Sequence, residues 1–353
     1  MPHIALALAI GAGGGALFWV LRLPLPWMLG AMSACAIAAM AGLPVGVPRV
    51  LRAVMIVVLG VMLGSAFTPT LFDRIGEWLA TIAGMAAYVV LAGGMVYVYF
   101  RRVAHYGPIT AFFTAMPGGL NEMILVGTAM GGDDRLISLS HGVRVMIVVF
   151  VLVFGFRFFA GYEPVGIAGG GARLADIAAP DLLILAASGA LGAAAAIALR
   201  LPAAPLLGAM AVSAAVHLAG VTDSRPPGEL VAVAQVVVGS AVGSRFAGVR
   251  FALIARAARH AVVAAALMLG AAAAIGAAVA AITGIPGTTL LLAYAPGGLA
   301  EMSLVAIALG ADAAFVATHH IIRIMIVITL APPFFRRIGR RKALPSERAP
   351  DDD

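Results

Sequence analysis

Long apolar runs recur along this chain and leave few folds open to it. An apolar run needs about 20 residues to cross the ~30 Å hydrocarbon core of a bilayer. Lipid offers no hydrogen-bond partners, so the backbone of such a run must satisfy itself as a helix. The charged fraction of 11% is far below that of a typical soluble domain. We therefore expect an all-α integral membrane protein, with helices over Ile4–Leu21, Val50–Phe67, Trp78–Phe100, Leu136–Ala160, Leu182–Leu199, Val231–Phe246, Ala261–Thr283 and Phe315–Phe335.

Charge and cysteine content narrow the class further. The net charge is +7, but the basic residues are spread over short loops and one tail, which fits membrane loops better than a nucleic-acid-binding face. Cys35 is the single cysteine, which excludes an internal disulfide and a multi-cysteine metal cluster. The first three residues contain no Lys or Arg, so we expect Ile4–Leu21 to be a retained span and not a cleaved signal. We expect no cofactor, no metal and no nucleic-acid partner.

The second half of the chain repeats the first at a spacing of 178 or 179 residues. Pro-Gly-Gly-Leu-x-Glu-Met occurs at 117–123 and 296–302, and His-x-x-Arg-x-Met-Ile at 141–147 and 320–326. Two further landmarks keep the same order, the Arg-Leu-Pro segments (22–32 and 200–210) and the Gly-x-x-x-Gly-Ser-x-Phe segments (60–67 and 239–246). The duplication predicts two homologous transmembrane repeats, 1–172 and 173–341, and a polar cytoplasmic tail, 342–353.

The distribution of Lys and Arg favours inverted repeats. If the Pro-Gly-Gly segments cross the membrane, the chain has twelve spans and parallel repeats, and the loop charges divide 13 to 8 between the two sides. If these segments are re-entrant, the charges divide 16 to 5, with the excess on the N-terminal side. The positive-inside rule favours the second arrangement. We expect about ten transmembrane helices, five per repeat, with both termini cytoplasmic, and a cytoplasmic linker at 161–173 would exclude this arrangement.

The two Pro-Gly-Gly segments are predicted to break their helices inside the membrane. Proline removes a backbone donor and glycine weakens a helix, so the chain should open at Pro117, Gly118 and Gly119, and again at Pro296, Gly297 and Gly298. Irregular backbone at this depth must be buried in protein or line a wet cavity. The new helix N-terminus attracts anions.

Each break is followed by a glutamate at the same position. Glu122 and Glu301 either cap their own half-helices, pair with an arginine, or take part directly in ion or substrate binding. Asn121 aligns with Ala300, so a shared site would be asymmetric and Asn121 would be a substrate contact.

A histidine and an arginine share one helix face in each repeat, His141 with Arg144 and His320 with Arg323. An arginine inside a span costs roughly 2.5–3.5 kcal/mol on insertion scales, so it should meet a carboxylate, carbonyl oxygens or an anionic ligand. Pairing with the glutamate of the same repeat is one interpretation. The other is that the arginines receive an anionic substrate while a glutamate carries a coupling proton. The histidines are either proton relays or hydrogen-bonded packing residues.

Three further features have structural interpretations. Asp133 and Asp312 are expected to cap the final long helix of each repeat. The Gly-x-x-x-Gly patterns are helix-packing motifs, and glycine-rich faces would also allow a homodimer. The basic cluster at 336–342 should lie against anionic lipid head groups.

The duplicated Pro-Gly-Gly-Leu-x-Glu-Met motif, with the His-x-x-Arg-x-Met-Ile motif after it, resembles the bacterial membrane AbrB family. The resemblance covers residues 4 to about 337 and implies a duplicated-domain inner-membrane protein, unrelated to the soluble DNA-binding regulator of the same name. Labels within the family include transporter, regulator of a stress gene and ammonia monooxygenase. The last fits poorly, because the scattered histidines and lone cysteine offer no convincing ligand set for oxygen chemistry.

The sequence therefore predicts an inner-membrane transporter that moves a small solute, preferentially a small anion and with proton coupling, through a site at the repeat interface. The expected site residues are Asn121, Glu122, Glu301, Arg144, Arg323, His141 and His320, shaped by the two breaks. A membrane-embedded regulator of gene expression acting through a partner is the alternative, and an ammonia monooxygenase-like enzyme is less favoured. No catalytic residue is expected.

Overall fold

The computed structural model describes residues 2–69, 76–159, 161 and 172–342. Regular structure in these ranges is helical throughout. The elements are α1 (Pro2–Val20), α2 (Pro26–Met40), α3 (Arg49–Gly64), α4 (Trp78–Arg102), α5 (Pro108–Ala115), α6 (Leu120–Ala129), α7 (Asp134–Phe159), η3 (Leu174–Asp176), α8 (Ala179–Ala198), α9 (Ala204–Leu218), α10 (Gly228–Gly243), η4 (Ser244–Phe246), α11 (Phe251–Thr283), α12 (Gly287–Tyr294), α13 (Leu299–Ala308) and α14 (Ala313–Lys342).

The prediction of an all-helical membrane protein is confirmed at this level. Among the described residues, seven helical segments are long and apolar enough to cross a bilayer, and α2, α9 and α13 are shorter apolar helices. The number of spans and the inversion of the repeats stay predictions. The linker at 162–171 and the end of the tail, 343–353, lie outside the described residues.

Helix order and bounds follow the same series in both halves of the chain. The bounds of α5, α6 and α3 recur 179 residues later in α12, α13 and α10. The positions of left-handed backbone recur as well, at residue pairs 22/200, 25/203, 42/220, 105/284 and 131/310. Two of these five pairs, 42/220 and 131/310, have glycine in both copies, so the turns are shared in shape more closely than in residue type.

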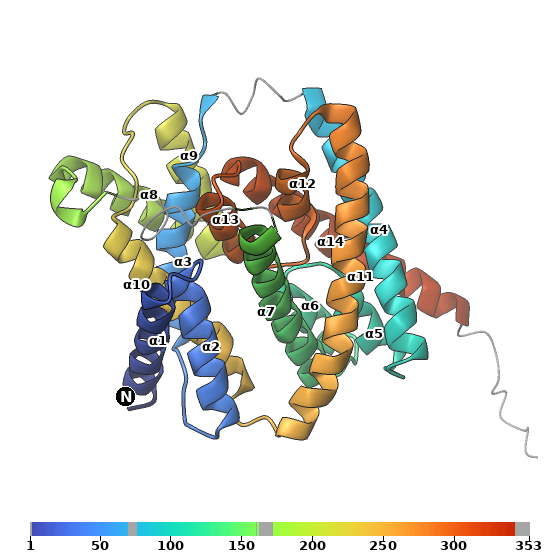
Figure 1. The fold of residues 1–353 in the computed structure, drawn as a ribbon. Coiled ribbons are helices and arrows are strands. Elements are labelled where there is room, and N and C mark those ends of the chain that lie inside the picture. Colours follow the sequence, from blue (N-terminus) through green and yellow to red (C-terminus); the bar gives the residue numbers. More distant parts are fainter. Residues whose placement is uncertain (1, 70–75, 160, 162–171, 343–353) are drawn as a thin grey trace, which may run out of the picture.

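The helices form two bundles, each built from both halves (Figure 1). The six-helix bundle contains α1, α2, α3, α8, α9 and α10, and the hairpin bundle contains α4–α7 and α11–α14. The two bundles meet mainly where α3 contacts α13 and α14, and where η4 contacts α7. Neither half of the sequence forms a bundle by itself, so the two halves depend on each other for their cores.

Small residues bring the helices of the six-helix bundle into close contact. Helix α3 crosses α9 at Gly64, where an added methyl carbon would lie 2.5 Å from the Met210 carbonyl oxygen. Helix α10 crosses α2 in the same way, with Gly239 against the carbonyl of Met28. The two Gly-x-x-x-Gly motifs therefore join one half of the chain to the other, as is usual for small-residue motifs in membrane helices.

The short helices α5 and α6 fold back on each other and form a hairpin. The amide nitrogen of Asp133, just after α6, donates to the Thr110 hydroxyl in the first turn of α5 at 3.0 Å. The entry and exit of the segment therefore lie together, as in a re-entrant hairpin. Helices α4 and α11, which precede the two hairpins, pack side by side and run in opposite directions (Figure 1).

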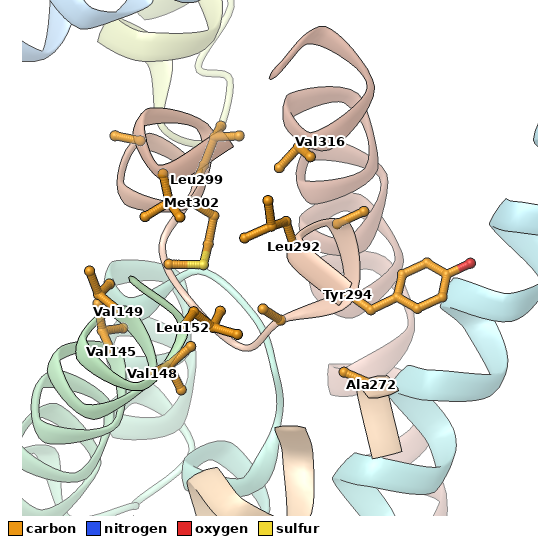
Figure 2. Packing of buried hydrophobic residues seen from close by; sticks show 14 of the residues in the cluster. Val145, Val148, Val149, Leu152, Ala272, Leu292, Tyr294, Leu299, Met302 and Val316 are labelled. Carbon is orange, nitrogen blue, oxygen red and sulfur yellow. The ribbon is translucent and has the colours of Figure 1, made fainter. Parts of the chain in front are cut away.

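The second hairpin packs against a helix of the first half. Figure 2 shows Leu299 and Met302 of α13 beside Val145, Val149 and Leu152 of α7, with the connection from α12 passing between them. The first break packs in turn against a helix of the second half. A methyl carbon added at Gly118 would lie 2.8 Å from Val327 of α14. Each break is thus buried against a long helix of the opposite half of the chain.

The capping prediction for Asp133 and Asp312 is confirmed. A side-chain oxygen of Asp133 accepts from the amide of Leu136 at 2.9 Å, and Asp312 accepts from Phe315 at the same distance. These carboxylates therefore satisfy free amides at the starts of α7 and α14.

Candidate solute-binding site

Both Pro-Gly-Gly segments break their helices as predicted. Helix α5 ends at Ala115 and α6 begins at Leu120, with extended backbone at Met116 and Gly119 between them. Helices α12 and α13 are separated in the same way, with Gly298 at the N-cap of α13. Each break therefore presents two helix ends, the carbonyls of the first short helix and the amides of the second.

Arginines from α7 and α14 bind the carbonyl ends of these breaks. Arg144, which is 3% exposed, donates to the carbonyls of Thr114 and Met116 at 3.3 and 3.4 Å. Arg323, which is 1% exposed, donates to the carbonyls of Ala295 and Gly297, the latter at 2.8 Å. Carbonyl oxygens are thus the observed acceptors, in place of the glutamate pairing that was one interpretation of the sequence. A cation at a helix C-terminus is favoured both by the free carbonyls and by the helix dipole.

The two histidines hold these arginines in place. His141 Nδ1 accepts from Arg144 at 2.9 Å, and His141 Nε2 lies 2.8 Å from the Phe113 carbonyl. His320 repeats both contacts with Arg323 and Leu292, at 3.2 and 3.0 Å. A carbonyl only accepts, so Nε2 carries the proton and Nδ1 is free to accept, which is one neutral tautomer. Both ring nitrogens are occupied, which favours the packing interpretation over a proton relay.

The glutamates lie at the opposite ends of the breaks. Glu122 and Glu301 are the third residues of α6 and α13, and each side chain folds back over its N-cap glycine. A methyl group on Gly119 or Gly298 would overlap the carboxylate, so glycine leaves the space that the carboxylate occupies. A negative charge at a helix N-terminus is stabilised by the dipole and the free amides. Each break therefore carries an arginine at its carbonyl end and a glutamate at its amide end.

A cavity of about 510 Å³ lies where the two breaks meet the six-helix bundle. One wall contains the glycines and glutamates of both breaks together with His141, Arg144 and Arg323. The other wall comes from α3, the start of α9 and the end of α10. Its residues are Arg49, Arg52, Ala53, Ile56, Ala203, Pro205, Leu206, Val238, Val242 and Arg245.

The structure brings most of the expected site residues together. Glu122, Glu301, Arg144, Arg323 and His141 all line the cavity. His320 is fully buried and is not among the lining residues, since it lies behind Arg323. The side chain of the remaining candidate, at position 121, lies outside the described part of the structure. Within the described residues, no group of three or more His, Cys, Asp or Glu side chains is arranged to hold a metal.

The cavity contains three arginines that the sequence does not predict as site residues, Arg49, Arg52 and Arg245, because by sequence they count among the basic residues of the loops. These residues have no basic counterpart in the other repeat, where Gly228, Val231 and Ala66 stand at the equivalent positions. That difference between the copies is the signal that could have identified them, as it identified Asn121. The cavity thus has five arginines against two glutamates among its lining residues.

A tyrosine lies close to both span arginines. Tyr88 of α4 is fully buried, stacks on Tyr294, and has a hydroxyl without a hydrogen-bond partner among the described residues. Its hydroxyl is near enough to Arg144 and Arg323 for their charges to act on it. No sequence motif marks Tyr88, and the aligned residue of the second repeat is Leu267.

Comparison with known proteins identifies the family. The family model described as "Transition state regulatory protein AbrB" matches residues 27–339. The chain is also 31% identical over 358 residues to the Bacillus subtilis (strain 168) protein named "Uncharacterized protein YhjN", covering 93% of this chain and 91% of that protein. The resemblance indicated by the duplicated motifs is therefore confirmed, and this chain belongs to the membrane-type AbrB family.

Proposed function

We propose that this protein is a membrane transporter for a small solute, bound in the cavity between the hairpin bundle and the six-helix bundle. The observation that carries the proposal is that two broken helices, one from each repeat, open into a single cavity of about 510 Å³. Broken helices that meet at a repeat interface are a recurring arrangement for solute sites in transporters. Packed protein alone gives no reason to keep five arginines and two glutamates at such a place.

The proposed topology has ten spans and inverted repeats in a bacterial inner membrane, with both termini cytoplasmic. The fold-back of α5 and α6 supports re-entrant hairpins, and the opposite directions of α4 and α11 support inversion. On this topology the hairpins enter from opposite sides of the membrane. The excess of Lys and Arg on the N-terminal side agrees with it.

Alternating access would come from motion of one bundle against the other. The cavity lies between the bundles, so a rigid-body movement changes its exposure without unfolding either bundle. The charge excess in the lining favours a small anion. Glu122 and Glu301 remain the candidates for a coupling proton, because they are the acidic residues of the lining.

Cysteine accessibility tests the proposal directly, because the chain has a single, buried native cysteine. Ala53→Cys and Ala300→Cys, in a Cys35→Ser background, place a thiol on each wall of the cavity. In proteoliposomes, a membrane-impermeant maleimide added from either side should label both positions, since a transporter exposes its site alternately. Gly155→Cys, where an added carbon meets nothing within 4 Å, serves as a control outside the cavity.

Labelling of both cavity positions from one side only, whatever solute is added, would contradict alternating access. That outcome would favour the second candidate, a membrane-embedded regulator that acts through a partner. Deleting the chain after Ile338 separates the two further, because a regulator that acts through the tail should fail while a transporter should still work.

A further inference from the structure

We propose that Arg52 and Arg245, and not the two arginines inside the spans, bind the charged group of the solute, and that the solute is a small organic anion. The inference rests on the proposed transport function and names the substrate class of the same cavity. It also assigns a direction to the site, because both arginines line the wall that comes from the six-helix bundle, Arg52 in the first turn of α3 and Arg245 in η4 just after α10.

The two arginines inside the spans, Arg144 and Arg323, already donate hydrogen bonds to groups of the protein. Arg144 makes three hydrogen bonds, to two carbonyls and His141, and Arg323 makes three of the same kinds. These contacts satisfy carbonyls that the breaks leave free, and losing them would leave buried polar groups unpaired. If a solute took over these donors, the free energy of its new hydrogen bonds would be offset by the cost of leaving the carbonyls unpaired. Arg144 and Arg323 are better placed to shape the breaks than to release and rebind a solute.

Arg52 and Arg245 lack comparable partners. The Nε atoms of Arg52, Arg144 and Arg323 are all buried without a hydrogen-bond partner among the described residues. The terminal guanidinium nitrogens make the difference, because those of Arg144 and Arg323 donate to carbonyls and histidines. Arg245 lies close enough to Arg52 for the two charges to repel each other, and Glu301 is the acidic residue whose charge offsets this. One carboxylate against two partly buried guanidinium groups leaves a positive charge uncompensated, and an anionic ligand would compensate it.

The rest of the lining is apolar next to these arginines. Ile56 lies one helical turn after Arg52, and Val242 lies three residues before Arg245. Leu206 and Leu299 line the same cavity from α9 and α13. A bare inorganic ion would leave these surfaces against water, whereas a carboxylate with a hydrocarbon part would cover them. The lining therefore fits a carboxylate that carries an apolar skeleton.

Arg245 also connects the cavity with a second one. A cavity of about 440 Å³ shares Arg245 and Gly142 with the first and is bounded by Asp134, Arg135 and Arg250. The α10–α11 connection that carries Arg245 lies at the same end of the molecule as the N-terminus (Figure 1). On the proposed topology the anion is therefore captured from the cytoplasmic side, and no equivalent arginines serve the other side.

Ligand-dependent thermal stability of the detergent-purified protein tests the inference. The probes are small carboxylates with and without an apolar tail, such as benzoate and succinate, beside their uncharged amides and a panel of amines. We expect carboxylates to raise the melting temperature and the amides not to. Arg52→Gln and Arg245→Gln should each weaken binding about 10- to 100-fold, the loss expected for one charge-assisted hydrogen bond. Arg256→Gln, an exposed position on α11, is the matched control and should bind like the wild type.

Sided transport gives the second readout. Benzoate or another active carboxylate should show a raised KM from the N-terminal face of proteoliposomes containing Arg245→Gln, and an unchanged KM from the opposite face. Arg245→Lys should restore part of the affinity, which a merely structural role would not predict. Unchanged carboxylate binding in both glutamine variants, or stabilisation by amines alone, would overturn the inference and leave transport standing. Absence of stabilisation by every probe class would overturn the inference and remove the support for a solute site.

Discussion

A methyl group added at Gly64 should weaken the contact between the two halves of the chain. The added carbon would lie 2.5 Å from the Met210 carbonyl oxygen and 2.5 Å from Cβ of Ser213, whereas ordinary contacts begin at 3.4 Å. Helices α3 and α9 must therefore separate by up to about 0.9 Å, the difference between these two distances. A gap of that size forfeits about a quarter to a half of the dispersion energy of each affected contact.

The expected cost of Gly64→Ala is about 1–3 kcal/mol relative to Gly94→Ala. Overpacking a tight contact costs about this much, and the obstructing atoms at Gly64 include backbone, which cannot rotate away. Gly94 of α4 is the control because an added carbon there meets nothing within 4 Å. Gly94 lies inside α4 and gains about 1 kcal/mol of helix propensity, whereas Gly64 is the last residue of α3 and gains less, so part of the expected difference comes from propensity.

The native cysteine provides the assay. Cys35 is fully buried on α2, within the same six-helix bundle, so a thiol-reactive fluorescent dye reacts when that bundle opens. Gly64→Ala should release the dye signal at a lower temperature than the wild type, and Gly94→Ala at the same or a higher temperature. Equal melting of the two variants would refute the close crossing of α3 and α9 as the contact that joins the repeats.

Three further predictions follow from single contacts. Asp312→Ala should cost about 1 kcal/mol of stability in the same melting assay, because it removes the side-chain acceptor at the start of α14. Tyr88→Phe should leave the ligand-free protein as stable or more stable, because the hydroxyl has no partner among the described residues; a loss above about 1 kcal/mol would show that the hydroxyl is bound inside the protein. Gly298→Ala should displace the Glu301 carboxylate, whose charge offsets that of Arg245, and raise carboxylate-induced stabilisation, with Gly155→Ala as the unobstructed control; unchanged ligand response would remove Glu301 from the site.

The sequence predicts the breaks well because their cause is local. Pro117 lacks an amide hydrogen and is followed by two glycines, so no neighbouring residue can rescue the helix there. The fold-back of the segment is harder to predict, since it depends on a contact between Asp133 and Thr110, which are 23 residues apart in the sequence. The charge count favours a re-entrant segment, but only tertiary contacts specify which residues meet.

The partners of Arg144 and Arg323 cannot be deduced by pairing opposite charges in the sequence. Glutamate was an attractive partner by charge, and carbonyl oxygens were only one alternative. The break itself changes the competition, because it leaves carbonyl oxygens at the ends of α5 and α12 without helical amide donors. Leaving a buried carbonyl unsatisfied costs about 1–3 kcal/mol, so an arginine that reaches it has a strong local partner already.

The sequence does not identify Arg49, Arg52 and Arg245 as site residues, and the reason is geometric. Arg49 and Arg52 begin α3, and Arg245 follows α10, so by sequence all three read as ordinary residues at helix ends. They line the cavity because α3 contacts α13 and α14, and η4 contacts α7, which brings these segments to the breaks. Contacts between segments far apart in the sequence thus determine which charges enter the site.

The charge arrangement suggests how binding is coupled to movement. Each break is balanced within the hairpin bundle, with an arginine at its carbonyl end and a glutamate at its amide end. The uncompensated positive charge belongs to the six-helix bundle, on Arg52 and Arg245. An anion in the proposed position therefore contacts the arginines of the six-helix bundle with its charged group and the apolar lining of the hairpin bundle, such as Leu299, with its skeleton. Any separation of the bundles must give up one of these two sets of contacts, so an occupied cavity should resist opening more strongly than an empty one.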